Sequence, residues 1–157
     1  MRVLMFILAW LSVTVAAEVI VVDDNGQQVK LSGPAKRIIS LAPNITEVLF
    51  YIGAGDQIVG ADEYSNYPEA AKDILRVNNH AAANYELILS LKPDLVIAWQ
   101  SGNGDKIIDP LRKLDIPVFV VETKKKWMRF LAYFEGSVNL AAIEIWLSNG
   151  QLHFPSA

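Results

Sequence analysis

The chain has 157 residues, of which 52% are hydrophobic and 20% charged, and its formal net charge is −3 at pH 7. This length accommodates one domain with a hydrophobic core of ordinary size. The acidic balance argues against nucleic acid as a partner, and the absence of cysteine excludes disulfides and thiolate metal sites.

The first 17 residues have the composition of a secretory signal peptide. Arg2 supplies a positive charge, residues 3–11 are apolar, and Val15-Ala16-Ala17 places small residues where a signal peptidase cleaves. The apolar run is short for a bilayer span. We therefore expect a signal peptide at 1–17 and a periplasmic or extracytoplasmic location. The alternative is a buried first helix or strand.

Residues 18–34 are expected to form a β-hairpin. Two β-rich segments, 19–22 and 27–31, flank Asn25-Gly26, and both of these residues tolerate the positive φ of a hairpin turn. Gly33-Pro34 then closes the unit.

From residue 37 onward, strands alternate with helices. After a strand at 37–41, Asn44 is the expected N-cap of a helix, and Glu47 completes a near capping box. Asn84 is expected to cap a later helix that ends before Pro93. Further strands are expected at 57–61, 74–77, 95–99 and 116–121, and further helices at 69–73, 85–91 and 105–114.

The alternation predicts an α/β fold in which a parallel sheet is flanked by helices, preceded by the hairpin. The apolar run 95–98 is typical of a strand covered on both faces. Each strand delivers a polar or aromatic loop to one edge of the sheet: Pro43-Asn44, residues 62–68 with Tyr64, the loop with His80, and Trp99 before the loop 100–104. Ligands bind at that edge in open α/β sheets, so these loops predict a binding surface.

Individual residues in these loops leave alternatives open. Trp99 is either a platform for a ligand or a cap on the core. His80 is a solvated loop histidine or a single axial ligand to a metal already held in a macrocycle. Asp62, Glu63 and Asp105 are expected to be solvated rather than catalytic. Because no P-loop, Gly-x-Ser-x-Gly or His-Glu-x-x-His motif occurs and no nucleophile has a base beside it in sequence, we expect no enzymatic activity. His80 is the only histidine of the α/β region, so we expect no protein-only metal site.

Five consecutive segments together resemble a known family. They are residues 37–47 (Arg-Ile-Ile-Ser-Leu-Ala-Pro-Asn-Ile-Thr-Glu), 53–60 (Gly-Ala-Gly-Asp-Gln-Ile-Val-Gly), 64–68 (Tyr-Ser-Asn-Tyr-Pro), 84–99 (from Asn-Tyr-Glu to Ile-Ala-Trp) and 111–122 (from Leu-Arg-Lys to Val-Val-Glu). In this order they resemble the substrate-binding proteins of ABC importers for vitamin B12, haem and iron–siderophore complexes. The similarity is greatest to the vitamin B12-binding branch. It covers residues 35–122, the part that forms the N-terminal lobe in that family.

The resemblance implies two lobes joined by a long helix, with cobalamin or an iron chelate carried as ligand in the cleft and no intrinsic cofactor. It implies that Tyr64 and Trp99 lie on the cleft wall, and that Glu86 docks the lobe onto an ABC permease. The vitamin B12 binders have a tryptophan where this chain has His80, a difference that would suit haem or another corrinoid.

The resemblance ends at Glu122, and residues 123–157 follow no pattern of the family. After the lysine run at 124–126 we hypothesise a frameshifted tail, which would leave the chain truncated. The alternative is a naturally short protein with its own C-terminal helix. Two other functional hypotheses stay open: a small secreted α/β enzyme, and a truncated fragment that binds nothing.

Overall fold

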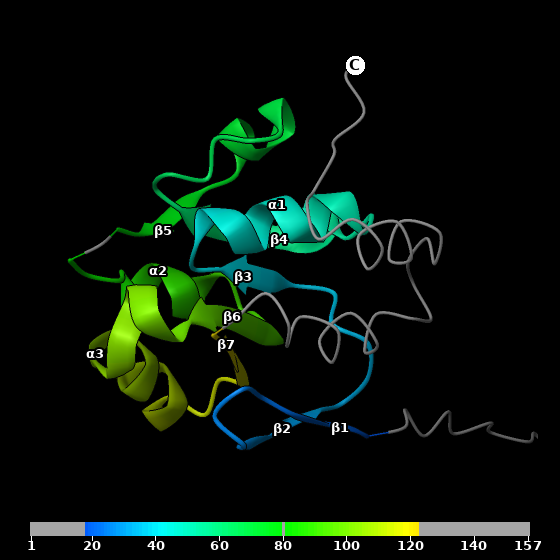
Figure 1. Ribbon diagram of the computed structural model, residues 1–157, viewed down its shortest axis with the longest axis vertical. Coiled ribbons are helices and arrows are strands. Elements are labelled where there is room, and N and C mark those ends of the chain that lie inside the picture. The colour runs from blue at the N-terminus through cyan, green and yellow to red at the C-terminus, as the bar shows by residue number, and fades with distance from the viewer. Residues whose placement is uncertain (1–17, 80, 123–157) are drawn as a thin grey trace, which may run out of the picture.

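The computed structural model describes residues 18–79 and 81–122, so the predictions for residues 1–17, His80 and residues 123–157 lie outside the described residues. Five parallel strands form one sheet in the order β5-β4-β3-β6-β7 (Figure 1). These strands are β3 (Ile38–Ser40), β4 (Ile58–Asp62), β5 (Arg76–Asn78), β6 (Leu95–Trp99) and β7 (Val118–Val121). The predicted parallel sheet is therefore confirmed.

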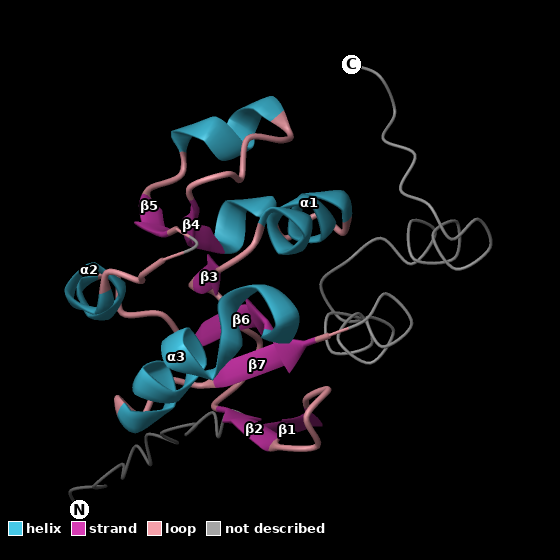
Figure 2. Cartoon of the chain, turned by 60° about the vertical axis from the view of Figure 1, so that its left-hand side comes forward, coloured by secondary structure: helices cyan, strands magenta, loops and turns pink. Residues whose placement is uncertain are grey.

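Helices cover both faces of this sheet. Helix α1 (Pro43–Tyr51) lies on one face, and α2 (Tyr85–Ser90) and α3 (Gln100–Lys113) lie on the other (Figure 2). Two short 3₁₀ turns, η1 (Gly55–Gln57) and η2 (Glu69–Asp73), precede β4 and β5. Within residues 18–79 and 81–122, no helix has the length and apolar character needed to cross a membrane.

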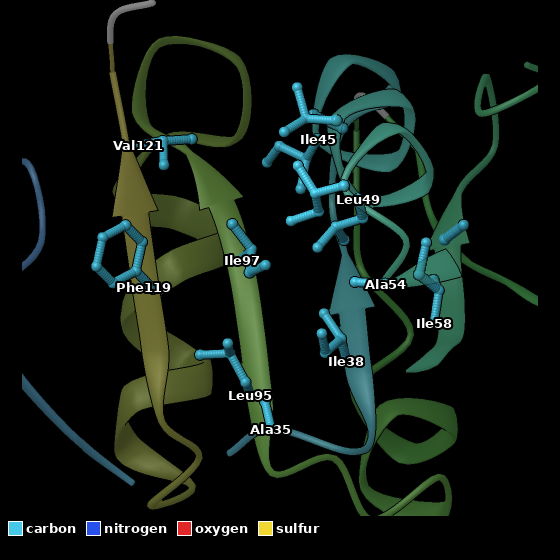
Figure 3. Packing of buried hydrophobic residues seen from close by; sticks show 14 of the residues in the cluster. Ala35, Ile38, Ile45, Leu49, Ala54, Ile58, Leu95, Ile97, Phe119 and Val121 are labelled. Carbon is cyan, nitrogen blue, oxygen red and sulfur yellow. The ribbon is translucent and has the colours of Figure 1, made fainter. Parts of the chain in front are cut away.

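Alternation along the strands divides the core into two layers. On the α1 face, the buried cluster contains Ile38, Leu95, Ile97, Phe119 and Val121 of the sheet with Ile45 and Leu49 of α1 (Figure 3). On the other face, it contains Ile39, Val96, Ala98, Val118 and Val120 with Ile88, Ile107, Ile108 and Leu111 of the two helices. Because both faces are covered, β6 and β7 are apolar at every position, as expected for a buried parallel sheet, and β3 departs from this pattern at Ser40.

The hairpin of β1 (Val19–Val22) and β2 (Gln28–Leu31) is antiparallel, as predicted, and lies beyond the β7 edge of the sheet (Figures 1 and 2). Its turn is fixed to that edge: the backbone N–H of Asp24 donates to the carbonyl of Val120 at 3.0 Å. The buried carboxylate of Asp23 pairs with Arg112 of α3 at 3.1 Å. The hairpin therefore shields the edge strand β7, which limits pairing with other chains.

Two local predictions need correction. Helix α1 begins at Pro43 with Ala42 as its N-cap and no side-chain cap, so the predicted capping box of Asn44 and Glu47 is wrong. Proline fits the first helical position because its φ is already helical and its missing N–H would be unpaired there anyway.

Residues 100–103, predicted as loop, form the first turn of α3, and the break in this helix lies at Gly104 with φ 64° and ψ 170°. The predicted cap of α2 is confirmed, because the side chain of Asn84 accepts from the N–H of Leu87 at 3.0 Å.

Candidate functional site

The carboxyl ends of β3 and β6 are neighbours in the sheet, and the chain leaves them toward opposite faces. From β3 the chain continues to α1 on one face, whereas from β6 it continues to α3 on the other face. Connections that diverge in this way leave a topological switch point, where ligands of open α/β sheets bind. Leu41 follows β3 at this point, and Trp99 is the last residue of β6.

Trp99 combines features of both proposed interpretations. The residue is 37% exposed, so it is not sealed into the core. One part of the indole lies against the first turn of α3, because a Cβ built on Gly102 would come within 3.1 Å of three indole atoms. The backbone N–H of Trp99 donates to Oδ1 of Asn103 at 2.8 Å. One part of the indole thus packs against Gly102, and Trp99 is still accessible to solvent.

Tyr64 lies in the loop after β4, so the central strand β3 separates it from Trp99 in the sheet order. Tyr64 is 50% exposed, and Tyr67 in the same loop is 43% exposed. The backbone N–H of Tyr64 donates to Oδ1 of Asp62 at 2.9 Å. Exposed aromatic residues therefore stand at the carboxyl edge on both sides of β3, with Tyr64 and Tyr67 on one side and Trp99 on the other.

Asp62 itself corrects a prediction, because it is 4% exposed rather than solvated. Its second carboxylate oxygen accepts from Nδ2 of Asn78 at 2.7 Å. A buried carboxylate requires such hydrogen bonds to offset the loss of water. Asp62 therefore shapes the Tyr64 loop. Glu63 and Asp105 are exposed, as expected.

A chain of buried hydroxyls anchors the Tyr64 loop from the other side. Oγ1 of Thr46, in α1, lies 2.8 Å from Oγ of Ser40 and 2.8 Å from Oγ of Ser65. All three residues are at most 1% exposed. The network ties β3, α1 and the residue after Tyr64 together, and a satisfied buried network makes a loop rigid.

A recess of about 410 Å³ lies where β4 and β5 end. Its polar lining comes from Glu63, Arg76, Asn78, Asn79 and Asn84. Within the described part of the chain, no group of three or more His, Asp or Glu side chains is arranged to hold a metal ion. This polar recess at the ends of β4 and β5 was not identified from the sequence.

Glu86 is exposed in the first turn of α2. The cap from Asn84 fixes where this helix begins, and a carboxylate near a helix N-terminus interacts favourably with the helix dipole.

Glu47, in α1, is partly buried, and this burial raises the pKa of its carboxyl group above the usual value of 4.5.

Comparison with protein families matches residues 38–142 to the periplasmic binding protein family. The matched range extends past Glu122, into the segment that the structure does not describe. It covers more than half of the chain.

Individual relatives are vitamin B12-binding proteins. Those of Vibrio campbellii and Vibrio cholerae are 46% identical over 92 residues and 48% identical over 91 residues. These alignments cover 59% and 58% of this chain but 34% and 33% of the relatives, so the chain spans about a third of their length.

Solved structures give the same result. The periplasmic vitamin B12-binding protein BtuF of Vibrio cholerae is 39% identical with a TM-score of 0.67, over 73% of this chain and 48% of that one. The haem-binding protein HmuT is 25% identical with a TM-score of 0.60, over 82% of this chain and 41% of that one. The parallel sheet, the hairpin and these matches together show that the chain belongs to the periplasmic binding protein family.

Proposed function

We propose that the chain captures a corrinoid or an iron chelate such as haem at the carboxyl edge of its sheet and delivers it to an ABC permease. The observation that carries this proposal is the pair of exposed aromatic residues, Tyr64 and Trp99, on either side of β3 at the topological switch point. Relatives named as vitamin B12-binding and haem-binding proteins support it.

The physics of large planar ligands agrees with this surface. A corrin or porphyrin ring offers a broad apolar face, and aromatic side chains cover such a face at little cost in conformational entropy. Trp99 rests on Gly102, and the Tyr64 loop is held by buried hydrogen bonds, so both residues are arranged before ligand arrives. Such preorganisation lowers the cost of binding.

The polar recess at the ends of β4 and β5 supports a corrinoid as the first candidate. Two of its lining residues, Asn79 and Asn84, are exposed and carry carboxamide side chains. The periphery of a corrinoid carries carboxamides as well, whereas haem carries two carboxylates. His80 as an axial ligand stays a prediction that would favour haem instead.

Delivery and location follow from the same proposal. Glu86 is exposed on a short, capped helix, where it can pair with a basic residue of a permease. Residues 1–17 would direct the chain out of the cytoplasm to the periplasm, the location named for the Vibrio cholerae structure.

Titration of the purified chain with cyanocobalamin and with haemin, followed by absorbance and calorimetry, tests the proposal. We expect saturable binding of one of the two, and weaker binding by Tyr64→Ala. Leu114→Ala is the matched control: Leu114 is 39% exposed and follows α3, away from the carboxyl edge. Absence of binding to both ligands, or equal affinity of wild type and Tyr64→Ala, would contradict the proposal.

A further inference from the structure

The backbone carbonyl of Leu41, just after β3, accepts hydrogen bonds from two side-chain amides, one at the end of β5 and one in the first turn of α3. Nδ2 of Asn103 donates to it at 2.9 Å, and Nδ2 of Asn78 donates at 3.3 Å. A carbonyl oxygen has two lone pairs, so it can serve both donors at once. Leu41 is 1% exposed, which places this junction inside the protein at the topological switch point.

The first arm of the junction leads to Trp99. While Nδ2 of Asn103 donates to Leu41, its Oδ1 accepts the backbone N–H of Trp99 at 2.8 Å. One amide therefore connects the end of β3 with the residue that carries the indole. Gly102, immediately before Asn103, leaves room for the indole to lie against the helix.

The second arm leads to Tyr64. The same Nδ2 of Asn78 also donates to Oδ2 of Asp62 at 2.7 Å, and Oδ1 of Asp62 accepts the backbone N–H of Tyr64 at 2.9 Å. Asp62 and Asn78 are 4% and 7% exposed. Hydrogen bonds to a buried carboxylate are among the stronger ones in proteins, so this arm is held firmly.

We propose that Asn78 and Asn103 are positioning residues that set Tyr64 and Trp99 in a fixed relation through their shared acceptor, the Leu41 carbonyl. Neither asparagine needs to touch a ligand: each acts through the aromatic residue at the end of its arm. This inference rests on the proposed function for what the two aromatic residues bind, but the bonding pattern that defines it does not depend on any ligand.

The arrangement also explains why asparagine suits both positions. Each side chain must donate to the Leu41 carbonyl, and Asn103 must accept from Trp99 at the same time. An aspartate at 103 keeps the acceptor but replaces the donor with an oxygen that repels the carbonyl. Asn103→Asp therefore breaks the junction while it preserves the bond to Trp99, and Asn103→Ala removes both.

The first experiment measures amide hydrogen exchange by NMR on the whole 157-residue chain without ligand. In Asn103→Ala we expect the Trp99 amide to exchange about fivefold faster relative to the amide of Ile97 in the same strand, the loss that corresponds to one ordinary hydrogen bond. Division by the Ile97 rate removes any effect of a general loss of stability. In Asn103→Asp the Trp99 amide should stay protected.

Asp94→Ala is the matched control. Asp94 also joins two distant segments, because its carboxylate accepts the N–H groups of Lys36 at 2.8 Å and Arg37 at 3.0 Å, but it does so at the amino end of β6. Its substitution should leave the Trp99 exchange ratio unchanged. An unchanged ratio in Asn103→Ala, or an equal change in Asp94→Ala, would overturn the proposal.

The second experiment is a double-mutant cycle on the dissociation constant of cobalamin or haemin, whichever binds. If Asn103 acts only through Trp99, then Asn103→Ala combined with Trp99→Ala should bind no more weakly than Trp99→Ala alone. Additive losses would overturn the positioning role. If the wild-type chain binds neither ligand, the proposed function fails, and the exchange experiment still decides the inference.

Discussion

Substitution of Gly102 by alanine would separate ligand binding from stability more cleanly than removal of Trp99. A Cβ at residue 102 would meet Cε3, Cζ3 and Cδ2 of the Trp99 indole, all within 3.1 Å. Carbon atoms in contact approach to about 3.5 Å, so Cζ3, at 2.8 Å, must move by roughly 0.7 Å, and the closer Cε3 by more. Because the indole is 37% exposed, it can move outward without compressing the core.

We expect Gly102→Ala to stabilise the folded chain but to weaken ligand binding. Gly102 lies in the first turn of α3 and its φ is not positive, so alanine suits its backbone and stabilises the helix by up to about 1 kcal/mol. A displaced indole loses its contact with the ligand, and aromatic contacts contribute about 0.5–1.5 kcal/mol. We therefore expect cobalamin or haemin affinity to fall roughly two- to tenfold while the unfolding midpoint in urea is unchanged or higher.

Gly55→Ala supplies a closely matched control. A Cβ on Gly55 would also come within 3.1 Å of three ring atoms, in this case those of Phe50, which packs on the core of the α1 face. That variant should lose stability and keep ligand affinity, since η1 precedes β4 and lies away from the carboxyl edge. Unaltered affinity in Gly102→Ala, with an indole shown by NMR to have moved, would refute Trp99 as a ligand platform. A large loss of stability would show instead that the indole is a core residue.

Three further predictions concern other parts of the chain. Glu86→Ala should reduce association with the cognate permease in a pull-down and leave ligand affinity unchanged; a loss of ligand affinity would place Glu86 in the ligand site instead. Burial raises the pKa of Glu47, so the folded state holds its proton more tightly, and stability should fall as pH rises from about 4.5 towards neutrality. Glu47→Gln should abolish that fall in urea midpoints measured across this range, and an identical pH profile in the variant would exclude Glu47 as its source. Asn84→Ala should cost about 1 kcal/mol in urea unfolding because α2 loses its cap, and no loss would show that the cap contributes nothing.

The sequence predicted the parts of the fold that depend on local pattern. The apolar run in β6 indicated a strand buried on both faces, and Asn84 indicated the start of α2, because strand burial and helix capping are encoded within a few residues. The exposure of Tyr64 at the carboxyl edge followed from the order of strands and loops.

The polar connections of the site could not be predicted in this way. Asp62 is buried because it meets Asn78, 16 residues away, and Asn103 meets Leu41 across 62 residues. No local pattern marks such pairs, and an aspartate in a polar loop is usually exposed. The failed cap at Asn44 has a different cause: Pro43 was itself suited to begin the helix.

The central claim is that a corrinoid or iron chelate binds at the carboxyl edge of this sheet. Mapping of backbone amide shifts in the 157-residue chain during titration with cyanocobalamin, and separately with haemin, tests it most directly. We expect saturable shifts at Tyr64, Trp99 and Asn103, with little change at Arg37 and Asp94 on the amino edge. Shifts confined to the amino edge, or none with either ligand, would contradict it.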